Sequence, residues 1–228
     1  MRADGKAADG APRIRYVHAV PRAGLDEASR AVAAASPVMA RLYAEHGPYR
    51  PGRAERVGER FEGLASSITY QQLAGSAASI IWGRVRALVD GPFTPEAVAA
   101  VDIEALRAAG LSGAKARSIH DLAAHVADGR VRLDRIGRLP DDAVVAELTQ
   151  VWGIGTWTAQ MFLMFALRRL DVWPVGDLGV RAGWARAHEL DEVPGPAELE
   201  ELGELFRPYR SVAAWYCWRV ADTKVPTI

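Results

Sequence analysis

The 228-residue sequence has little cysteine and no excess of either charge. Its single cysteine, Cys217, excludes an intramolecular disulfide, a zinc site built on several cysteines and an iron–sulfur cluster held by four of them. Lys and Arg together number 28, as do Asp and Glu, so the formal net charge is zero. Many nucleic-acid-binding domains are basic overall, so a DNA-binding protein of this composition would depend on a local patch of contacts.

Long apolar runs are also missing. No stretch approaches the roughly 20 apolar residues that a membrane-spanning helix needs, and the charged N-terminus lacks the apolar segment of a secretory signal. We therefore expect a cytoplasmic protein with no membrane partner. Half of the residues are apolar, which is enough for a sizeable core in one domain, or in one domain with two lobes.

Apolar residues at helical spacing predict an all-α protein. We expect residues 1–20 to be disordered or an extended arm, with 14–20 as a short strand at most, and residues 21–228 to form the folded domain. Another helix should start at Pro140 and lead into a glycine turn. The other principal predicted helices span residues 26–35, 37–45, 55–70, 76–88, 102–109, 114–127, 157–170, 178–188, 197–206 and 211–221.

The rest of the chain is organised around residues 148–180. Gly153 and Gly155 flank Ile154 between two predicted helices, so the backbone can turn sharply there. Such a turn aims backbone N–H groups outward at a helix N-terminus, where an anion such as a phosphate is favoured. Taken alone, the same glycines are more typical of a plain helix–turn–helix connection, in which they serve packing. A single carboxylate, Asp177, follows shortly after Pro174, which disfavours helix at the residue before it.

Residues 148–159 resemble the helix-hairpin-helix motif, and residues 173–179 resemble the Gly/Pro-rich loop with a catalytic aspartate after which one DNA glycosylase superfamily is named. Segments 67–74, 110–116 and 207–215 are similar to the alkylated-purine (3-methyladenine type) DNA glycosylases within it. The resemblance covers roughly residues 61–220. It implies a two-lobed helical domain with a cleft between the lobes.

This resemblance implies a base-excision repair enzyme that binds double-stranded DNA as a monomer, associated with the nucleoid. Such an enzyme flips a damaged base out of the duplex and hydrolyses its N-glycosidic bond. Asp177 takes the catalytic position, because a carboxylate stabilises positive charge on the sugar and activates water. By spacing alone, an ion pair between Asp177 and Arg181 on the following helix is the competing interpretation.

The resemblance also implies DNA contacts and a cation site. Contacts with the strand come from Gln71, Gln72, Gly153, Gly155, Thr156, Thr158 and Lys115, and Leu73 takes the position of a wedge that fills the gap left by the flipped base. Periodicity alone favours Leu73 as a core residue, and Lys115 lies equally well on a solvated face. The backbone carbonyls of Thr149, Val151 and Ile154 take the positions that hold a monovalent cation, Na⁺ or K⁺; no cofactor is required.

Trp157 occupies the position where strand-cutting members of the superfamily carry a lysine. Tryptophan cannot form a Schiff base, so we expect a monofunctional enzyme that uses water. An indole also attracts a cationic alkylated base, and Tyr43, Trp215 and Trp218 are further candidates for the base pocket. Gly176 replaces a second acid that some members carry, and no full β domain fits before residue 61. A non-catalytic DNA-binding module and a glycosylase for deaminated or oxidised bases remain alternatives.

Overall fold

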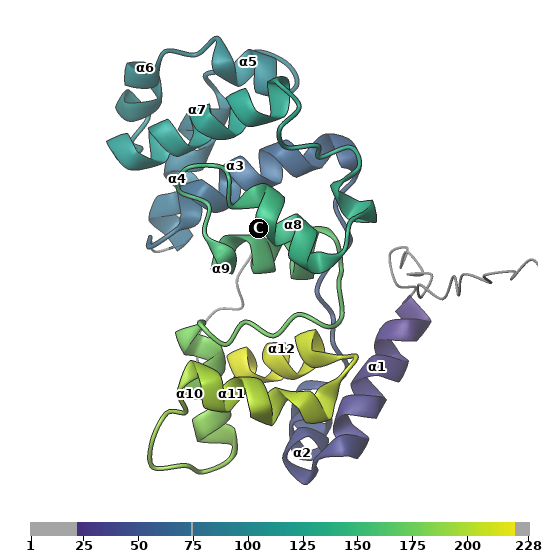
Figure 1. Cartoon of the computed structure of the whole chain (residues 1–228). Coiled ribbons are helices and arrows are strands. Elements are labelled where there is room, and N and C mark those ends of the chain that lie inside the picture. Colours follow the sequence, from purple (N-terminus) through teal and green to yellow (C-terminus); the bar gives the residue numbers. More distant parts are fainter. Residues whose placement is uncertain (1–21, 74, 222–228) are drawn as a thin grey trace, which may run out of the picture.

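The computed structural model describes residues 22–73 and 75–221, and within these ranges the chain is helical with no strand (Figure 1). The predicted all-α class is therefore confirmed. The N-terminal arm expected at residues 1–20 lies outside the described residues. Of the helices that are described, none is both long and apolar enough to cross a membrane.

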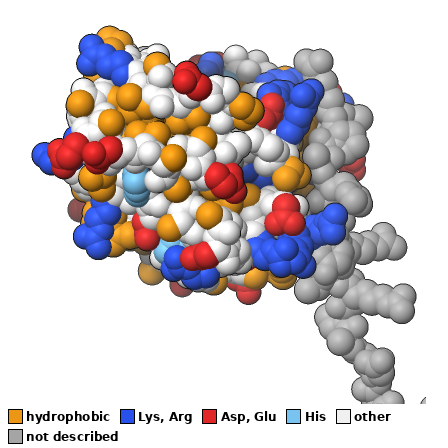
Figure 2. Space-filling model, turned by 90° about the horizontal axis from the view of Figure 1, so that it is seen from above, with side chains coloured by type: hydrophobic (Ala, Val, Ile, Leu, Met, Phe, Trp, Pro, Cys, Tyr) orange, Lys and Arg blue, Asp and Glu red, His pale blue; other side chains and the backbone are white. Residues whose placement is uncertain are grey.

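The helices form two lobes, one above the other in Figure 1. The upper lobe is one continuous stretch of the middle of the chain. It contains η1 (Val57–Glu59), α3 (Arg60–Tyr70), α4 (Gly75–Arg86), α5 (Pro95–Ala99), α6 (Ile103–Ala108), α7 (Gly113–Ala127), η2 (Ile136–Arg138), α8 (Asp141–Leu148), α9 (Thr156–Met161) and η3 (Phe162–Ala166). Seen from above, its outer face carries basic and acidic side chains interspersed with apolar ones (Figure 2).

The lower lobe combines the two ends of the described chain. It contains α1 (Arg22–Ala35), α2 (Pro37–His46), α10 (Leu178–Ala187), α11 (Pro196–Gly203), η4 (Glu204–Phe206) and α12 (Arg210–Val220). Helix α12 is the centre of this lobe, because its residues from Arg210 to Trp218 are all buried. It packs against α10, α2 and α1.

Helices α10 and α12 pack unusually closely. A Cβ at Gly183 of α10 would collide with the backbone carbonyl of Cys217 in α12, so only glycine fits at the crossing. Burial strongly raises the pKa of the Cys217 thiol, with a further contribution from the nearby Asp177 carboxylate, so this cysteine is an inert core residue. This contact fixes the start of α10, and therefore Asp177, against α12.

The helix predicted over residues 157–170 is interrupted, which corrects the sequence interpretation. Helix α9 ends at Met161 and continues as the π-helical turn η3, in which Leu167 N donates to Phe162 O (3.0 Å). Arg168 then takes a left-handed φ of 61°, and Arg169 N donates to Leu163 O (2.9 Å). The apolar pattern continues past this point because the segment stays buried, not because it stays helical.

The helix predicted over residues 55–70 is also shorter than expected. It begins at Arg60, after the short turn η1, because the N–H of Glu55 pairs with the carbonyl of Ala166 (3.0 Å) rather than starting a helix. The connection between α7 and α8 contains the 3₁₀ turn η2. The remaining predicted helices are present, with ends displaced by a few residues at most.

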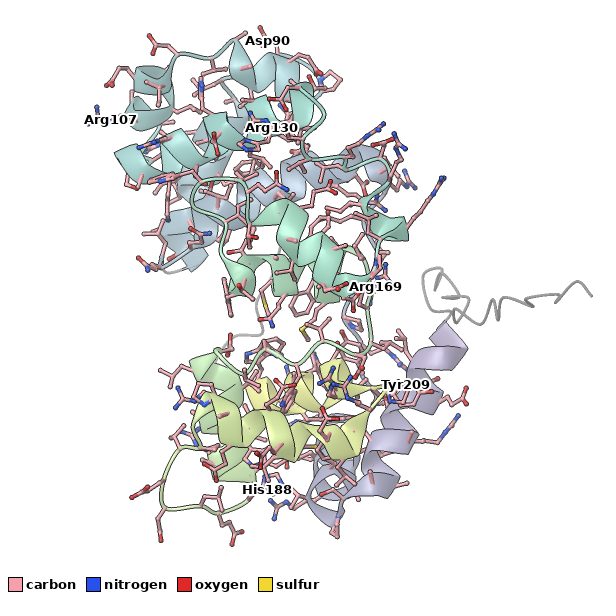
Figure 3. All side chains as sticks on the ribbon, in the orientation of Figure 1. Asp90, Arg107, Arg130, Arg169, His188 and Tyr209 are labelled. Carbon is pink, nitrogen blue, oxygen red and sulfur yellow. The ribbon has the colours of Figure 1, made fainter. Side chains whose placement is uncertain are left out.

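Polar contacts fix the segment between η3 and α10, which connects the two lobes. Arg169, which lies at the lower edge of the upper lobe in Figure 3, donates from Nη2 to the carbonyls of Gly137 (3.0 Å) and Leu139 (2.9 Å). In the next turn of chain, Asp171 accepts from Nε of the buried Arg210 (2.7 Å) at the start of α12. These bonds join the segment between η3 and α10 to both lobes. They therefore fix the position of Asp177 at the end of that segment.

Candidate active site

Asp177 stands at the N-terminus of α10, where the chain crosses from the upper to the lower lobe. Its backbone N–H donates to Pro174 O (2.9 Å), which closes the turn that the proline predicted. Its side-chain Oδ1 accepts from the N–H of Val180 (2.8 Å), so the carboxylate caps the helix. The residue is only 8% exposed. The side chain of Arg181 instead donates from Nε to Pro194 O (2.7 Å), which removes the ion-pair interpretation of Asp177.

Two tryptophans hold the Asp177 carboxylate. Trp218 of α12 donates from Nε1 to Oδ1 (2.9 Å), and Trp157 of α9 donates from Nε1 to Oδ2 (2.6 Å). Trp218 is 1% exposed, whereas Trp157 is 38% exposed. The three N–H donors come from two lobes and satisfy an ionised carboxylate, which can only accept. The acid is therefore held in one orientation beside an indole that faces solvent.

The other two aromatics predicted for the base pocket, Trp215 and Tyr43, pack in the lower lobe and do not bond to Asp177. Trp215 packs edge-on against Tyr49 (centroids 5.7 Å apart) and Tyr216 (5.2 Å) inside the lower lobe. Tyr43 of α2 is half-buried against the same core. Neither residue makes a hydrogen bond to Asp177, so the structure brings only Trp157 and Trp218 of the four to the carboxylate. Their role in base binding remains a prediction.

Phe165 is an aromatic near the site that the sequence interpretation missed. It lies on η3 and packs against the Trp218 ring with centroids 5.9 Å apart. Phe165 follows Trp157 by eight residues, a spacing that returns a side chain to the same helix face. That periodicity was the available signal, and the run of other apolar residues around Phe165 obscured it.

The glycine turn has the geometry of a tight hairpin between α8 and α9. Gly153 adopts a φ of 84°, and a Cβ there would lie 2.6 Å from Ser118 Oγ of α7. Gly155 has an extended φ of −95° as the residue before α9, and a Cβ there would meet no atom within 4 Å. Gly153 is therefore required by the fold, whereas the space beside Gly155 and the following N–H groups of Thr156 and Trp157 is open.

The three carbonyls predicted to hold a cation lie in this hairpin. Thr149 and Val151 follow α8, and Ile154 lies between the glycines. The carbonyl of Val151 accepts from Ile154 N (3.1 Å), which leaves it a second lone pair. The chemistry of hard oxygen donors fits a monovalent ion, and this site stays a prediction. In the described part of the chain, no group of three or more His, Cys, Asp and Glu side chains is arranged to hold a metal.

The predicted wedge segment is a short loop between α3 and α4. Gln72 adopts a left-handed φ of 55°, and Leu73 beside it is 40% exposed, which removes the interpretation of Leu73 as a core residue. Gln71 Nε2 donates to Gly153 O (3.3 Å) and Thr158 Oγ1 (3.2 Å). The wedge loop and the hairpin are thereby joined by one side chain.

Lys115 holds the wedge loop from behind. Its ammonium donates to the carbonyls of Thr69 (2.8 Å), in the last turn of α3, and Gln71 (2.5 Å), the residue after that helix. Partial burial lowers the pKa of this lysine. The interpretation of Lys115 as a residue on a solvated face is therefore wrong. Its predicted phosphate contact remains a prediction, and the contacts seen here are with the protein backbone.

The comparisons with known proteins agree with this geometry. Residues 65–208 match the pattern of the HhH-GPD superfamily base excision DNA repair proteins, and the chain belongs to that superfamily. Its fold and site define a DNA glycosylase of base excision repair. Over 178 residues, the sequence is 35% identical to DNA-3-methyladenine glycosylase 1 of Schizosaccharomyces pombe, with 77% of this chain and 78% of that protein covered.

Two solved structures are similar over most of the chain. The S. pombe 3-methyladenine DNA glycosylase in complex with abasic DNA matches with a TM-score of 0.77 at 33% identity, covering 87% of this chain and all of that one. A DNA-3-methyladenine glycosidase from Bacillus halodurans matches with a TM-score of 0.76 at 36% identity, covering 86% of this chain and 89% of that one. The lobed arrangement of Figure 1 is thus one that glycosylases share.

Proposed function

We propose that this protein is a monofunctional DNA glycosylase of the 3-methyladenine type, which releases alkylated purines from duplex DNA and leaves an abasic site. The observation that carries this proposal is the buried Asp177 carboxylate, held by Trp157, Trp218 and the N–H of Val180 beside a glycine hairpin. Relatives named as 3-methyladenine glycosylases at 33–36% identity support the substrate class.

The chemistry follows from where the carboxylate stands. When the N-glycosidic bond breaks, its electron pair leaves with the base and positive charge develops on the deoxyribose. The Asp177 carboxylate stabilises that charge and orients a water, and it accepts a proton from this water as the water oxygen bonds to the sugar carbon. An N-alkylated purine is already cationic, so it is a good leaving group and is attracted to an indole face. Trp157 provides an exposed indole next to the acid.

The DNA is held by backbone contacts from the hairpin at Gly155, Thr156 and Thr158, with Leu73 as the wedge. The extrusion of a nucleotide leaves a gap in the stack, and an exposed apolar side chain on a braced loop can fill it. We further propose that the carbonyls of Thr149, Val151 and Ile154 bind Na⁺ or K⁺ beside a phosphate. The protein would act as a monomer on the nucleoid.

A non-catalytic DNA-binding module is the weaker alternative. Such a module needs the hairpin alone, and nothing in DNA binding requires a buried carboxylate with three N–H donors from two lobes. A glycosylase for deaminated or oxidised bases would share the hairpin and the acid and would differ in its base pocket. The distinction is therefore one of substrate.

An excision assay tests the proposal directly. Duplexes that carry an alkylated purine, hypoxanthine, uracil or 8-oxoguanine are incubated with the enzyme, and the strands are separated with and without hot alkali. We expect alkali-dependent cleavage of the alkylated duplex alone or far above the others. Release of a deaminated or oxidised base at a higher rate would move the enzyme to another substrate class. Binding without release of any base would favour the non-catalytic module.

A further inference from the structure

A second aromatic side chain is exposed at the hairpin, on a residue that the active site does not use. Trp152 directly precedes Gly153 and is 43% exposed. The guanidinium carbon of Arg117, on α7, lies 4.6 Å from the centroid of its ring. The side chain of Arg117 is itself exposed. A single exposed apolar side chain is common on protein surfaces. Trp152 differs in that it carries a stacked cation and directly precedes Gly153 of the hairpin that is proposed to bind DNA.

The position of Trp152 is braced from behind. Its backbone N–H donates to Asp121 Oδ2 on α7 (2.6 Å). Asp121 Oδ2 lies 3.4 Å from Nδ1 of the buried His125, and His125 Nε2 lies 2.8 Å from Arg130 Nη1. The backbone of the turn is therefore fixed to α7 at Trp152, whose side chain is exposed.

Arg117 differs from the other arginines on α6 and α7 and in the loop after α7. Arg107 and Arg130 are neutralised by Glu104 (3.0 Å) and Asp128 (2.6 Å). Arg117 is paired with no carboxylate in the described part of the chain; its contact is the indole face of Trp152. An arginine stacked on a ring keeps its N–H edge free for a bidentate contact with phosphate. The charge of Arg117 is thus available to a ligand.

The pair also lies on the same edge as the predicted DNA contacts. Gln71 joins the wedge loop to Gly153, the residue next to Trp152, and to Thr158 on α9. Leu73, Trp152 and Trp157, three exposed apolar side chains from segments far apart in the sequence, are therefore displayed around one hairpin.

We propose that Arg117 and Trp152 form a second strand-binding site next to the hairpin. Arg117 binds a backbone phosphate of duplex DNA, and the Trp152 indole packs against the adjoining deoxyribose. The contact carries no base information, so it adds affinity for damaged and undamaged sequences alike. This inference rests on the proposed function, since it needs duplex DNA to lie against the hairpin.

The test measures how binding depends on salt. Affinity for a duplex with a tetrahydrofuran abasic analogue is measured by fluorescence anisotropy over a series of NaCl concentrations. The slope of log K against log [NaCl] is negative, and loss of one phosphate contact reduces its magnitude by about 0.9. Arg117→Gln should show that reduction. Trp152→Ala should weaken binding roughly tenfold with a smaller change of slope. Both side chains are exposed, so we expect both variants to melt at the wild-type temperature.

Arg53→Gln is the matched control, because it also removes one exposed arginine. Arg53 is held by Glu59 (2.6 Å) at the far end of α3, so its removal should leave both affinity and slope unchanged. If the wild-type protein excises the base but Arg117→Gln shows the same slope of log K against log [NaCl] as the wild type, the second site is overturned and the proposed function stands. If the wild-type protein neither binds the abasic duplex nor excises any base, the proposed function fails and this inference fails with it.

Discussion

The indole N–H of Trp157 donates to Oδ2 of Asp177 over 2.6 Å, and it joins the first turn of α9 in the upper lobe to the first residue before α10. The two residues are twenty positions apart in the sequence. The hairpin that is predicted to hold DNA and the acid that is predicted to catalyse base release are thereby fixed relative to each other. Because the bond involves a charged acceptor, it is stronger than one between neutral groups.

Replacement of Asp177 by asparagine should abolish most base release and preserve the fold. The amide oxygen of the new side chain can still cap α10 at Val180 N, but the neutral group cannot stabilise positive charge on the sugar. We expect the single-turnover rate on an alkylated duplex to fall by about 100-fold or more. Affinity for an abasic duplex should change little. A rate near that of the wild type would remove Asp177 from the mechanism.

Removal of one indole N–H tests whether the orientation of the carboxylate matters. Trp157→Phe keeps an aromatic face and deletes the bond to Oδ2, which is worth about 1.5–3 kcal/mol for a charged acceptor. We expect the rate to fall roughly tenfold to a hundredfold. Trp218→Phe is the comparison, because Trp218 is almost fully buried and its loss should also lower the melting temperature. Equal rates for Trp157→Phe and the wild type would contradict the positioning role.

The two glycines of the hairpin should behave differently when each is replaced by valine. Gly155→Val has room for its side chain and an allowed φ, so folding should cost less than about 1 kcal/mol while the new methyl groups block a phosphate. Gly153→Val must adopt a φ of 84° and displace Ser118, so it should lose about 2 kcal/mol or more of stability. Urea unfolding and binding to an abasic duplex separate the two effects. If Gly155→Val folds and binds the abasic duplex with unchanged affinity, the predicted phosphate contact at the hairpin is contradicted.

The reaction should leave an intact strand with an abasic site. The sequence has three lysines, Lys6, Lys115 and Lys224, and the ammonium of Lys115 is occupied by the carbonyls of Thr69 and Gln71. Incubation of enzyme and alkylated duplex with borohydride, followed by a denaturing gel, should show no covalent adduct. Strand breaks should appear only after alkali. An adduct trapped by borohydride would indicate a lyase activity and an amine nucleophile.

Glu55 should make stability depend on pH. Burial raises the pKa of its carboxyl from 4.5 to about 7, and Oε2 has no hydrogen-bond partner. A folded-state pKa above the unfolded value means that the native protein binds the extra proton, so this contribution to stability is present below about pH 4.5 and is lost as the pH rises to about 7. Glu55→Gln should remove that loss.

Urea unfolding at pH 5 and pH 8 measures the effect of Glu55 as a difference between the variant and the wild type. The variant should gain stability relative to the wild type between the two pH values, because glutamine stays neutral at both. Glu55 is only partly buried, so the gain should be smaller than the full pKa shift implies. If the difference in unfolding free energy between the variant and the wild type is the same at both pH values, ionisation of Glu55 costs the folded protein little stability.

Much of the fold could be predicted from local pattern. The helices predicted over 37–45 and 76–88 and the turn at Pro174 depend on neighbours a few residues away, and these elements are present. The end of the helical stretch before Leu170 could not be predicted, because Arg168 adopts a left-handed φ after η3 and its residue type does not indicate this. The carbonyl of Ala166, at the end of η3, then accepts a hydrogen bond from the N–H of Glu55, which is far from it in the sequence.

The sequence by itself determined the all-α class, the glycine hairpin and the position of one acid after it, because each follows from residues within a few turns of one another. Only the tertiary structure decided which aromatics reach that acid. Trp157 and Trp218 donate to Asp177, whereas Trp215, three residues before Trp218, packs in the core. The reason is geometric: the close crossing at Gly183 sets which face of α12 meets the start of α10, and such a long-range fit leaves no local trace in the chain.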